Sequence, residues 1–118
     1  MIPKSKRRSP CPVACTLDII GDRWTLLVIR DLFFGKRYFD EFLASPEGIA
    51  TNILSARLAS LTKLKLARRV ADERDKRRVA YELTERGRSL KSVLEAVARW
   101  GMEQCPGAAM LVGRERAE

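Results

Sequence analysis

The stretch 47-EGIATNILSARLASLTKLK-65 runs directly into the stretch 66-LARRVADERDKRRVAYEL-83. In the first stretch apolar residues recur every three or four positions, which predicts a helix over about 51–64. Its buried face comprises Ile53, Leu54, Leu58, Leu61 and Leu64. The second stretch holds two strand-like runs, about 67–71 and 79–83, on either side of the polar turn DERDKRR. We therefore expect a helix followed at once by a hairpin whose tip projects from the domain.

The other face of the predicted helix carries small side chains, several able to form hydrogen bonds. They are Thr51, Asn52, Ser55, Ala56 and Ala59. A helix face that only meets water is usually rich in Glu and Lys. Small polar residues instead suit close approach to another surface, such as the major groove of DNA.

The charge of the chain is concentrated around the predicted hairpin. Between residues 63 and 78 eight basic residues stand against three acidic ones. The basic ones are Lys63, Lys65, Arg68, Arg69, Arg74, Lys76, Arg77 and Arg78. The whole chain of 118 residues has a formal charge of +8 and a pI near 9.9. Both properties suit a polyanion, because each phosphate neutralised releases condensed counterions.

The elements before this region are predicted to be helical. Pro12 opens a first helix with an apolar face, and Gly21 ends it. Asp22 is the expected N-cap of a second helix that stops at Gly35. A minimal strand at 37–38 and a short helix in FDEFLAS, before Pro46, complete the N-terminal half.

After the hairpin, Thr84 is the expected N-cap of one long last helix that runs to Gly101. Together the elements predict a mainly α fold with a small antiparallel hairpin, a winged helix-turn-helix. We expect a flexible basic arm over 1–10, which either follows a phosphate backbone or only aids solubility. The DNA-binding and dimerisation domain then spans 11–104, and a C-terminal tail spans 105–118.

Several classes of protein fit the sequence poorly. No apolar run is long enough to span a bilayer and no secretory signal is visible, which indicates a cytoplasmic protein. An odd number of cysteines agrees with a reducing compartment. With no histidine, no glycine-rich phosphate loop and no nucleophile beside a base, we expect neither an enzyme nor a bound cofactor.

Four motifs together resemble the HxlR-type branch of the MarR-like winged helix transcriptional regulators, over about residues 11–101. These are Cys11-Pro12, Gly21-x-x-Trp24-Thr25, Leu58-x-x-Leu61 and Tyr81-x-Leu83-Thr84-x-x-Gly87. The resemblance implies a homodimer, built mainly by the first and last helices, that binds a pseudo-palindromic operator in double-stranded DNA. It leaves open whether this member represses or activates.

The hairpin tip departs from many HxlR-type members and is similar to the wing of the wider MarR-like group. That resemblance implies that Arg74 and Arg77 contact the minor groove, with Asp72 and Asp75 orienting them. A second departure is Ala50, where relatives often have a serine N-cap. Either Thr51 caps a helix one residue shorter, or this helix end is less well satisfied.

The predicted DNA contacts come from the helix and the residues around the hairpin. In the helix, Thr51, Asn52, Ser55 and Arg57 are candidates for base edges or nearby phosphates, although Arg57 could instead form an ion pair within the domain. The remaining candidates are Arg37, Lys63, Lys65, Arg74, Lys76 and Arg77.

Cys11 is the candidate for regulation by oxidation. It matches the position at which several family members sense oxidants, and the preceding basic residues and the helix N-terminus would make its thiol more reactive. The alternative is an inert small apolar residue. With Cys15 and Cys105 but no histidine, a zinc site is not expected.

Trp24 and Trp100 could line a pocket for a small-molecule effector at the dimer interface, or pack in the core. The fold itself leaves another function open, a protein-interaction or RNA-binding module without operator specificity. RNA-binding proteins usually expose aromatic residues, whereas the few aromatics here follow apolar stripes.

Overall fold

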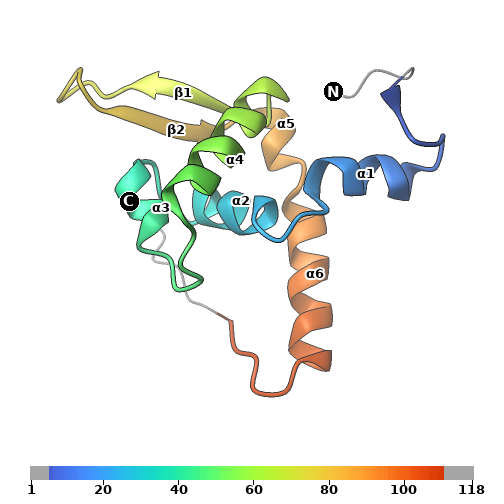
Figure 1. Ribbon diagram of the computed structural model, residues 1–118. Coiled ribbons are helices and arrows are strands. Elements are labelled where there is room, and N and C mark those ends of the chain that lie inside the picture. The colour runs from blue at the N-terminus through green and yellow to red at the C-terminus, as the bar shows by residue number, and fades with distance from the viewer. Residues whose placement is uncertain (1–5, 111–118) are drawn as a thin grey trace.

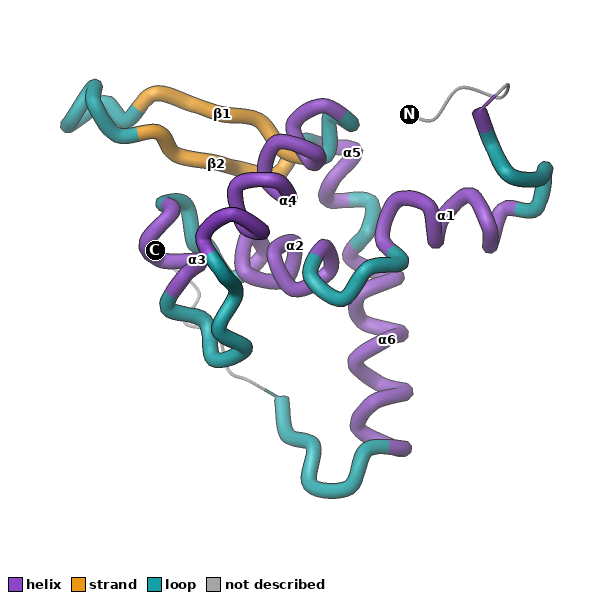
Figure 2. Tube along the Cα trace, viewed as in Figure 1, coloured by secondary structure: helices purple, strands orange, loops and turns teal. Residues whose placement is uncertain are grey.

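The computed structural model describes residues 6–110, and over this range it contains six helices and two strands. In chain order they are α1 (Pro12–Ile20), α2 (Thr25–Phe33), α3 (Phe39–Leu43), α4 (Thr51–Lys63), β1 (Ala67–Ala71), β2 (Val79–Leu83), α5 (Glu85–Arg88) and α6 (Lys91–Gln104). Figure 1 shows α4 lying over α2, with the hairpin projecting to one side and α1 to the other. Helix α6 leads away from this body, as the tube in Figure 2 also shows.

The hydrophobic core lies between α2, α3, α4 and the base of the hairpin. Its largest fully buried side chains are Phe42, Ile29, Leu54, Leu58 and Leu61. Burial of one such side chain contributes about 1.5–3 kcal/mol, so α4 is held chiefly by its apolar face. The expected buried face of α4 is confirmed at its centre, while Ile53 and Leu64 at its edges are half-buried.

Most of the predicted elements are confirmed. Both strands have the predicted bounds, and they pair antiparallel with Ala67 opposite Leu83 and Ala71 opposite Val79. The first helix begins at Pro12 and ends before Gly21, as expected. The short third helix is present, and α4 is one residue shorter than predicted. The mainly α fold with one small antiparallel hairpin is therefore confirmed.

Two details of the N-terminal half were predicted wrongly. The second helix begins at Thr25, because the residues after Asp22 first form a turn. The Asp22 carboxylate still caps this end, since it accepts the backbone N–H groups of Trp24 and Thr25, each at 3.0 Å. Residues 37–38 form no strand, although the Arg37 carbonyl accepts one hydrogen bond from the Tyr81 N–H of β2, at 2.8 Å.

The single long last helix was also a wrong prediction, because two helices stand in its place. The Thr84 hydroxyl accepts the Gly87 N–H at 3.0 Å and caps only the short α5. Helix α6 starts at Lys91 and continues through Gly101 to Gln104. Glycine inside a helix costs about 1 kcal/mol, which the remaining turns can offset.

The two tryptophans have different environments. Trp24 is half-buried against the core, whereas Trp100 is 64% exposed in the single chain, so core packing is wrong for Trp100. On the same helix Val97 is 51% exposed, and on α1 Val13 and Leu17 are 64% and 52% exposed. Both terminal helices thus present apolar side chains at the surface.

Lys65 joins α4 to β1 in the left-handed region, with φ of 62°. The Leu66 N–H donates to the Leu61 carbonyl and the Lys65 N–H to the Thr62 carbonyl, at 2.9 and 3.0 Å. These two bonds form a Schellman motif, which usually has glycine at the left-handed position.

In the part of the chain that the structure describes, none of the helices is long and apolar enough to cross a membrane.

Candidate nucleic-acid interface

The exposed face of α4 is made of small residues. Thr51, Asn52, Ser55, Ala56 and Ala59 are all exposed, as the sequence predicts. The opposite side of the helix is buried in the core. With few long side chains in the way, this face can approach a flat or grooved surface closely.

The start of α4 has no side-chain cap. Ala50 occupies the N-cap position and no side chain accepts a hydrogen bond from the free N–H groups. Of the two alternatives that the sequence leaves open, this is the less satisfied helix end. The position of Thr51 and Asn52 therefore depends on the preceding turn, residues 45–50.

That turn is fastened to α2 by a buried network of polar side chains. The Ser45 hydroxyl donates to the Asp31 carboxylate at 2.5 Å, and the side chain of Asp31 is only 5% exposed. Lys36 donates to the Ser45 hydroxyl at 2.6 Å. Ile49 adds an apolar anchor, since it is 9% exposed.

Arg30 contacts two carboxylates at once. Its guanidinium donates to Glu47 at 2.7 and 2.8 Å and to Asp31 at 2.9 and 3.1 Å. The hydrogen bonds that Arg30 donates to Glu47, above all other causes, raise the pKa of Arg30, and the same bonds lower the pKa of Glu47. This link between α2 and the turn was missed by the sequence analysis, because nothing in the spacing of Arg30 and Glu47 marks them as partners.

Arg57 lies at the edge of the exposed face of α4 and forms an ion pair within the domain. Its Nη1 atom is 3.4 Å from Oδ2 of Asp22, and its Nε atom is buried. Burial raises the pKa of Asp22, but hydrogen bonds from Thr25 and Trp24 and the charge of Arg57 outweigh it, so the pKa is lowered. The ion pair was one of the two roles that the sequence left open for Arg57.

The wing comprises β1, β2 and the loop 72–78 between them. Asp72 accepts the Arg74 N–H and Asp75 accepts the Arg77 N–H, each at 3.0 Å. The Arg77 guanidinium also binds Asp75 at 3.1 and 3.5 Å, while its side chain stays 91% exposed. Asp75 thus orients a guanidinium as expected, whereas the bond that joins Asp72 to Arg74 goes to the backbone.

Tyr38, just before α3, and Asp40, on α3, anchor the wing loop to the body. The Tyr38 hydroxyl donates to Asp72 at 3.1 Å, and the Arg78 guanidinium lies 3.7 Å from the centre of the Tyr38 ring. Arg78 also binds Asp40 at 3.3 Å. Because these residues are far apart in the sequence, their spacing gave no signal of this anchor.

Of the remaining predicted basic contacts, the three lysines are exposed and Arg37 is not. Lys63 is at the end of α4, Lys65 is in the turn after it, and Lys76 is at the tip of the wing loop. Arg37 is half-buried below the wing, with Nη2 3.8 Å from Glu82. Figure 1 shows the end of α4 beside the base of the wing, and α4 and β1 are in contact.

The three cysteines are free thiols. Cys11 is exposed at the N-cap of α1, Cys15 is half-buried and Cys105 is exposed after α6.

Part of the expected basic arm is folded, since the Arg8 side chain binds Asp18 at 2.6 Å. Residues 1–5 of the arm and 111–118 of the expected tail lie outside the described residues. Within 6–110 no group of three or more Cys, Asp or Glu residues could hold a metal ion.

The profile of the HxlR-like helix-turn-helix family matches residues 19–109. The uncharacterised HTH-type transcriptional regulator MT3179 of Mycobacterium tuberculosis is 43% identical over 94 residues, which are 80% of this chain and 59% of that protein. The chain thus spans about three fifths of the length of this curated relative.

Two solved structures have a similar fold. PA1607, described as a candidate transcription factor, superposes with a TM-score of 0.80 at 38% identity, covering 97% of this chain and 82% of its own. The redox regulator HypR, in its oxidised form, superposes with a TM-score of 0.72 at 30% identity, covering 80% and 97%.

Proposed function

Because the chain belongs to the HxlR-like helix-turn-helix family of transcriptional regulators, we propose that it regulates transcription by binding a pseudo-palindromic operator in double-stranded DNA as a homodimer. The observation that carries this proposal is the exposed face of α4 beside a basic wing. A helix with a small polar face fits the major groove, and a basic hairpin fits the adjacent backbone and minor groove. Such a role belongs to the cytoplasm.

We assign the contacts by position. The exposed N-terminal residues of α4, Thr51, Asn52 and Ser55, lie against base edges. Arg57, held by Asp22 at the side of the helix, reaches a phosphate. The wing and the surrounding basic residues bind the backbone and minor groove through Arg37, Lys63, Lys65, Arg74, Lys76 and Arg77.

The dimer is proposed to form through α1 and α6. The apolar side chains exposed on these helices, Val13, Leu17, Val97 and Trp100, would be covered by a second copy. A two-fold dimer then presents two α4 helices to two half-sites, which is why a palindromic operator is expected.

Cys11 is the proposed redox sensor. A two-electron oxidant such as diamide would take two electrons and two protons from two thiols, Cys11 and either Cys15, Cys105 or a thiol of the partner chain, to form a disulfide. Cys11 is exposed at the N-terminus of α1, a helix of the proposed dimer interface, so the bond would alter half-site spacing. If Cys11→Ser leaves the response of DNA binding to diamide unchanged, the sensor is not Cys11.

The direct test is fluorescence anisotropy with DNA from upstream of the chain's own gene and with random duplex of equal length. We expect selective binding that weakens steeply with salt. Arg77→Gln should weaken binding to both duplexes and reduce the salt slope by about 0.9. Arg99→Gln, at an exposed arginine of α6 that is not among the predicted DNA contacts, is the matched control. It should change neither the affinity nor the salt slope.

The alternative, an interaction or RNA-binding module, makes the opposite prediction. It gives equal affinity for both duplexes, and equal behaviour of the Arg77→Gln and Arg99→Gln variants. Either result would remove the operator-binding proposal.

A further inference from the structure

The Asp22 carboxylate joins the junction between α1 and α2 to helix α4. Asp22 follows Gly21, which ends α1, and precedes Thr25, the first residue of α2. Its Oδ2 atom accepts the Trp24 and Thr25 N–H groups, each at 3.0 Å, and the same atom lies 3.4 Å from Nη1 of Arg57 in α4. The side chain thus has two tasks, the cap of one helix and the ion pair with another.

The cap fixes the carboxylate in place. Besides the two backbone N–H groups, it accepts the hydroxyl of Thr25 at its second oxygen, and Thr25 is buried. A carboxylate with bonds at both oxygens cannot rotate without leaving the start of α2 uncapped. Asp22 therefore places a rigid negative charge beside α4.

Arg57 depends on Asp22 for its position. Its Nε atom is buried and has no hydrogen-bond partner within residues 6–110. The side chain is 34% exposed, so part of it reaches the surface at the edge of the exposed face of α4. An unheld arginine samples many rotamers, and ordering it on binding reduces affinity. The ion pair with Asp22 removes much of this cost in advance.

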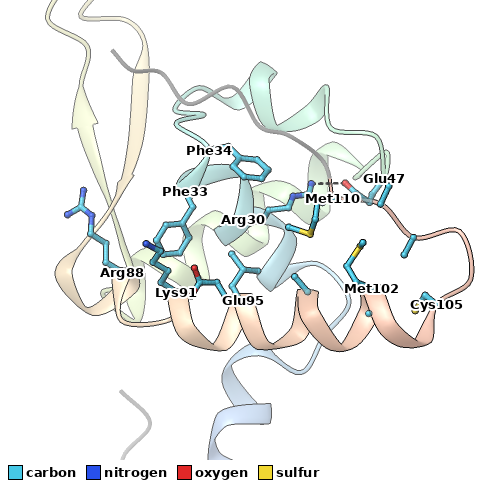
Figure 3. Close-up of a pocket in the computed structure, with 15 residues that line it drawn as sticks. Arg30, Phe33, Phe34, Glu47, Arg88, Lys91, Glu95, Met102, Cys105 and Met110 are labelled. Carbon is cyan, nitrogen blue, oxygen red and sulfur yellow. Dashed lines mark hydrogen bonds and ion pairs between the residues drawn. The ribbon is translucent and has the colours of Figure 1, made fainter.

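The α2 region holds α4 at two points. Arg30 of α2 binds Glu47 in the turn before α4, as the dashed lines in Figure 3 show. Asp22, just before α2, binds Arg57 in the second turn of α4. The first link holds the chain that leads into the helix, whereas the second acts directly on a predicted DNA contact.

We propose that Asp22 is a positioning residue that sets the selectivity of DNA binding through Arg57. It holds the guanidinium in the orientation that bridges Asp22 to one phosphate of the operator. It also keeps that guanidinium from pairing with phosphates in other positions on a random duplex. This inference rests on the function proposed above, because it concerns how the same surface distinguishes one duplex from another.

Selectivity is a ratio of two affinities, and the ion pair acts on both of them. On the operator, the phosphate meets a guanidinium that is already in place. On random duplex the helix has no fixed register, so a held arginine reaches fewer phosphates than a free one. The charge of Asp22 also repels DNA directly, but this repulsion acts on both duplexes alike and cancels in the ratio.

Asp22→Asn is the informative variant. Asparagine caps helices as well as aspartate does, so the bonds to Trp24 and Thr25 are kept while the charge that holds Arg57 is removed. A thermal melt checks that the fold is retained. Glu103→Gln, at an exposed acidic residue of α6, makes the same change of net charge and is the matched control.

Fluorescence anisotropy with the operator and with random duplex gives the ratio of the two Kd values. In Asp22→Asn we expect the selectivity to fall by about fivefold, the scale of ordering one long side chain. Random duplex should bind more tightly, and its salt slope should steepen by up to about 0.9, because the released Arg57 pairs with any phosphate. Glu103→Gln should leave the selectivity unchanged. Unchanged selectivity in Asp22→Asn would overturn the proposal.

A double-mutant cycle decides whether Asp22 acts through Arg57. Arg57→Gln removes the guanidinium, so adding Asp22→Asn to it should leave the selectivity where Arg57→Gln alone puts it. A further fall in the double variant would show that Asp22 works through the cap of α2 instead, and would overturn the positioning role.

The hold on Arg57 is tested without DNA by NMR relaxation of the arginine side-chain nitrogens. The Nε atom of Arg57 should be ordered in the unaltered chain and clearly more mobile in Asp22→Asn, while that of Arg30, bound to Glu47 and Asp31, stays ordered in both. Equal order of Arg57 in the two proteins would overturn this proposal alone. An unaltered chain that selects no operator would instead be a failure of the proposed function, and the claim on selectivity would fall with it.

Discussion

Helix α4 and the wing lie side by side but are held in place by different forces. Leu54, Leu58 and Leu61 of α4 are each no more than 1% exposed, so burial of apolar surface fixes the helix. The loop of the wing, 72–78, is instead fixed to the body by polar contacts of Asp72 and Arg78 with Tyr38 and Asp40. Hydrophobic burial is not screened by salt, whereas exposed ion pairs are weak and screened.

This difference separates the two parts of the proposed DNA-binding surface in stability. The helix should stay in place until the whole domain unfolds, while the wing loop 72–78 can move without cost to the core. Mutations should therefore affect either global stability or the wing loop alone. Four predictions test this separation, from the largest expected effect to the smallest.

The largest effect is expected from Leu58→Ala. The side chain is 1% exposed, and its loss should lower the free energy of unfolding by about 2–5 kcal/mol. Urea unfolding followed by circular dichroism measures it. Ser55→Ala, one turn away on the exposed face of α4, should change stability by less than about 0.5 kcal/mol. Similar losses in both variants would show that burial does not hold this helix.

The next effect concerns Gly87, where the base of the wing meets α5. An added Cβ would lie 2.0 Å from the Leu66 carbonyl oxygen and 2.9 Å from the Leu83 side chain. Gly87→Ala should therefore lower the unfolding free energy by about 1–3 kcal/mol. Gly101 lies in α6, and a Cβ added there would have no neighbouring atom within 4 Å. Gly101→Ala should therefore raise the unfolding free energy by about 0.5–1 kcal/mol. A thermal melt of the two variants should show shifts of opposite sign.

A smaller effect is expected at Tyr38. Tyr38→Leu removes the ring beneath Arg78, an interaction worth about 0.5–1 kcal/mol at an exposed site. Amide hydrogen exchange in residues 72–78 should become several-fold faster while exchange in α4 stays unchanged. Tyr38→Phe keeps the ring and loses only the bond to Asp72, so it should show the milder change. Faster exchange in α4 as well would mean that the two regions are coupled.

The smallest effect is the response of the wing loop to pH. The side-chain hydrogen bond from Arg77 is the main cause that lowers the pKa of Asp75 from 3.8, and the backbone bond from Arg74 likewise lowers that of Asp72. A lowered pKa in the folded state stabilises the loop fully above the unfolded value. That contribution is lost as the pH falls from about 3.8 through the lower folded value.

Carboxyl NMR titration measures this shift directly. The midpoint of Asp75 should lie below 3.8 and should rise towards it in Arg77→Gln. Between pH 5 and 8 the loop should not change. A midpoint at or above 3.8 in the unaltered chain would contradict the geometry of the loop.

The local pattern of the sequence was enough to predict α4 and the hairpin. The recurrence of leucines every three or four residues and the strand-like runs are periodic signals, and both depend on neighbouring residues only. The end of the second helix at Gly35 and the start of the first at Pro12 follow from local backbone preferences too.

Features that depend on distant partners could not be predicted. The close packing of Gly87 in α5 against the Leu66 carbonyl is one example. The pairs of Arg30 with Glu47 and of Tyr38 with Arg78 join residues 17 and 40 positions apart. Among the site residues, exposure was predictable from helical spacing, whereas the commitment of Arg57 to Asp22 was not.

The left-handed lysine after α4 has a thermodynamic meaning of its own. A residue with a Cβ in that conformation costs about 1–2 kcal/mol relative to the right-handed region, a cost that glycine largely avoids. Glycine there would favour folding but would leave the end of α4 without the exposed charge of Lys65. The chain thus gives up some of its small folding margin to keep a cation at the border between α4 and the wing, where a DNA contact is proposed.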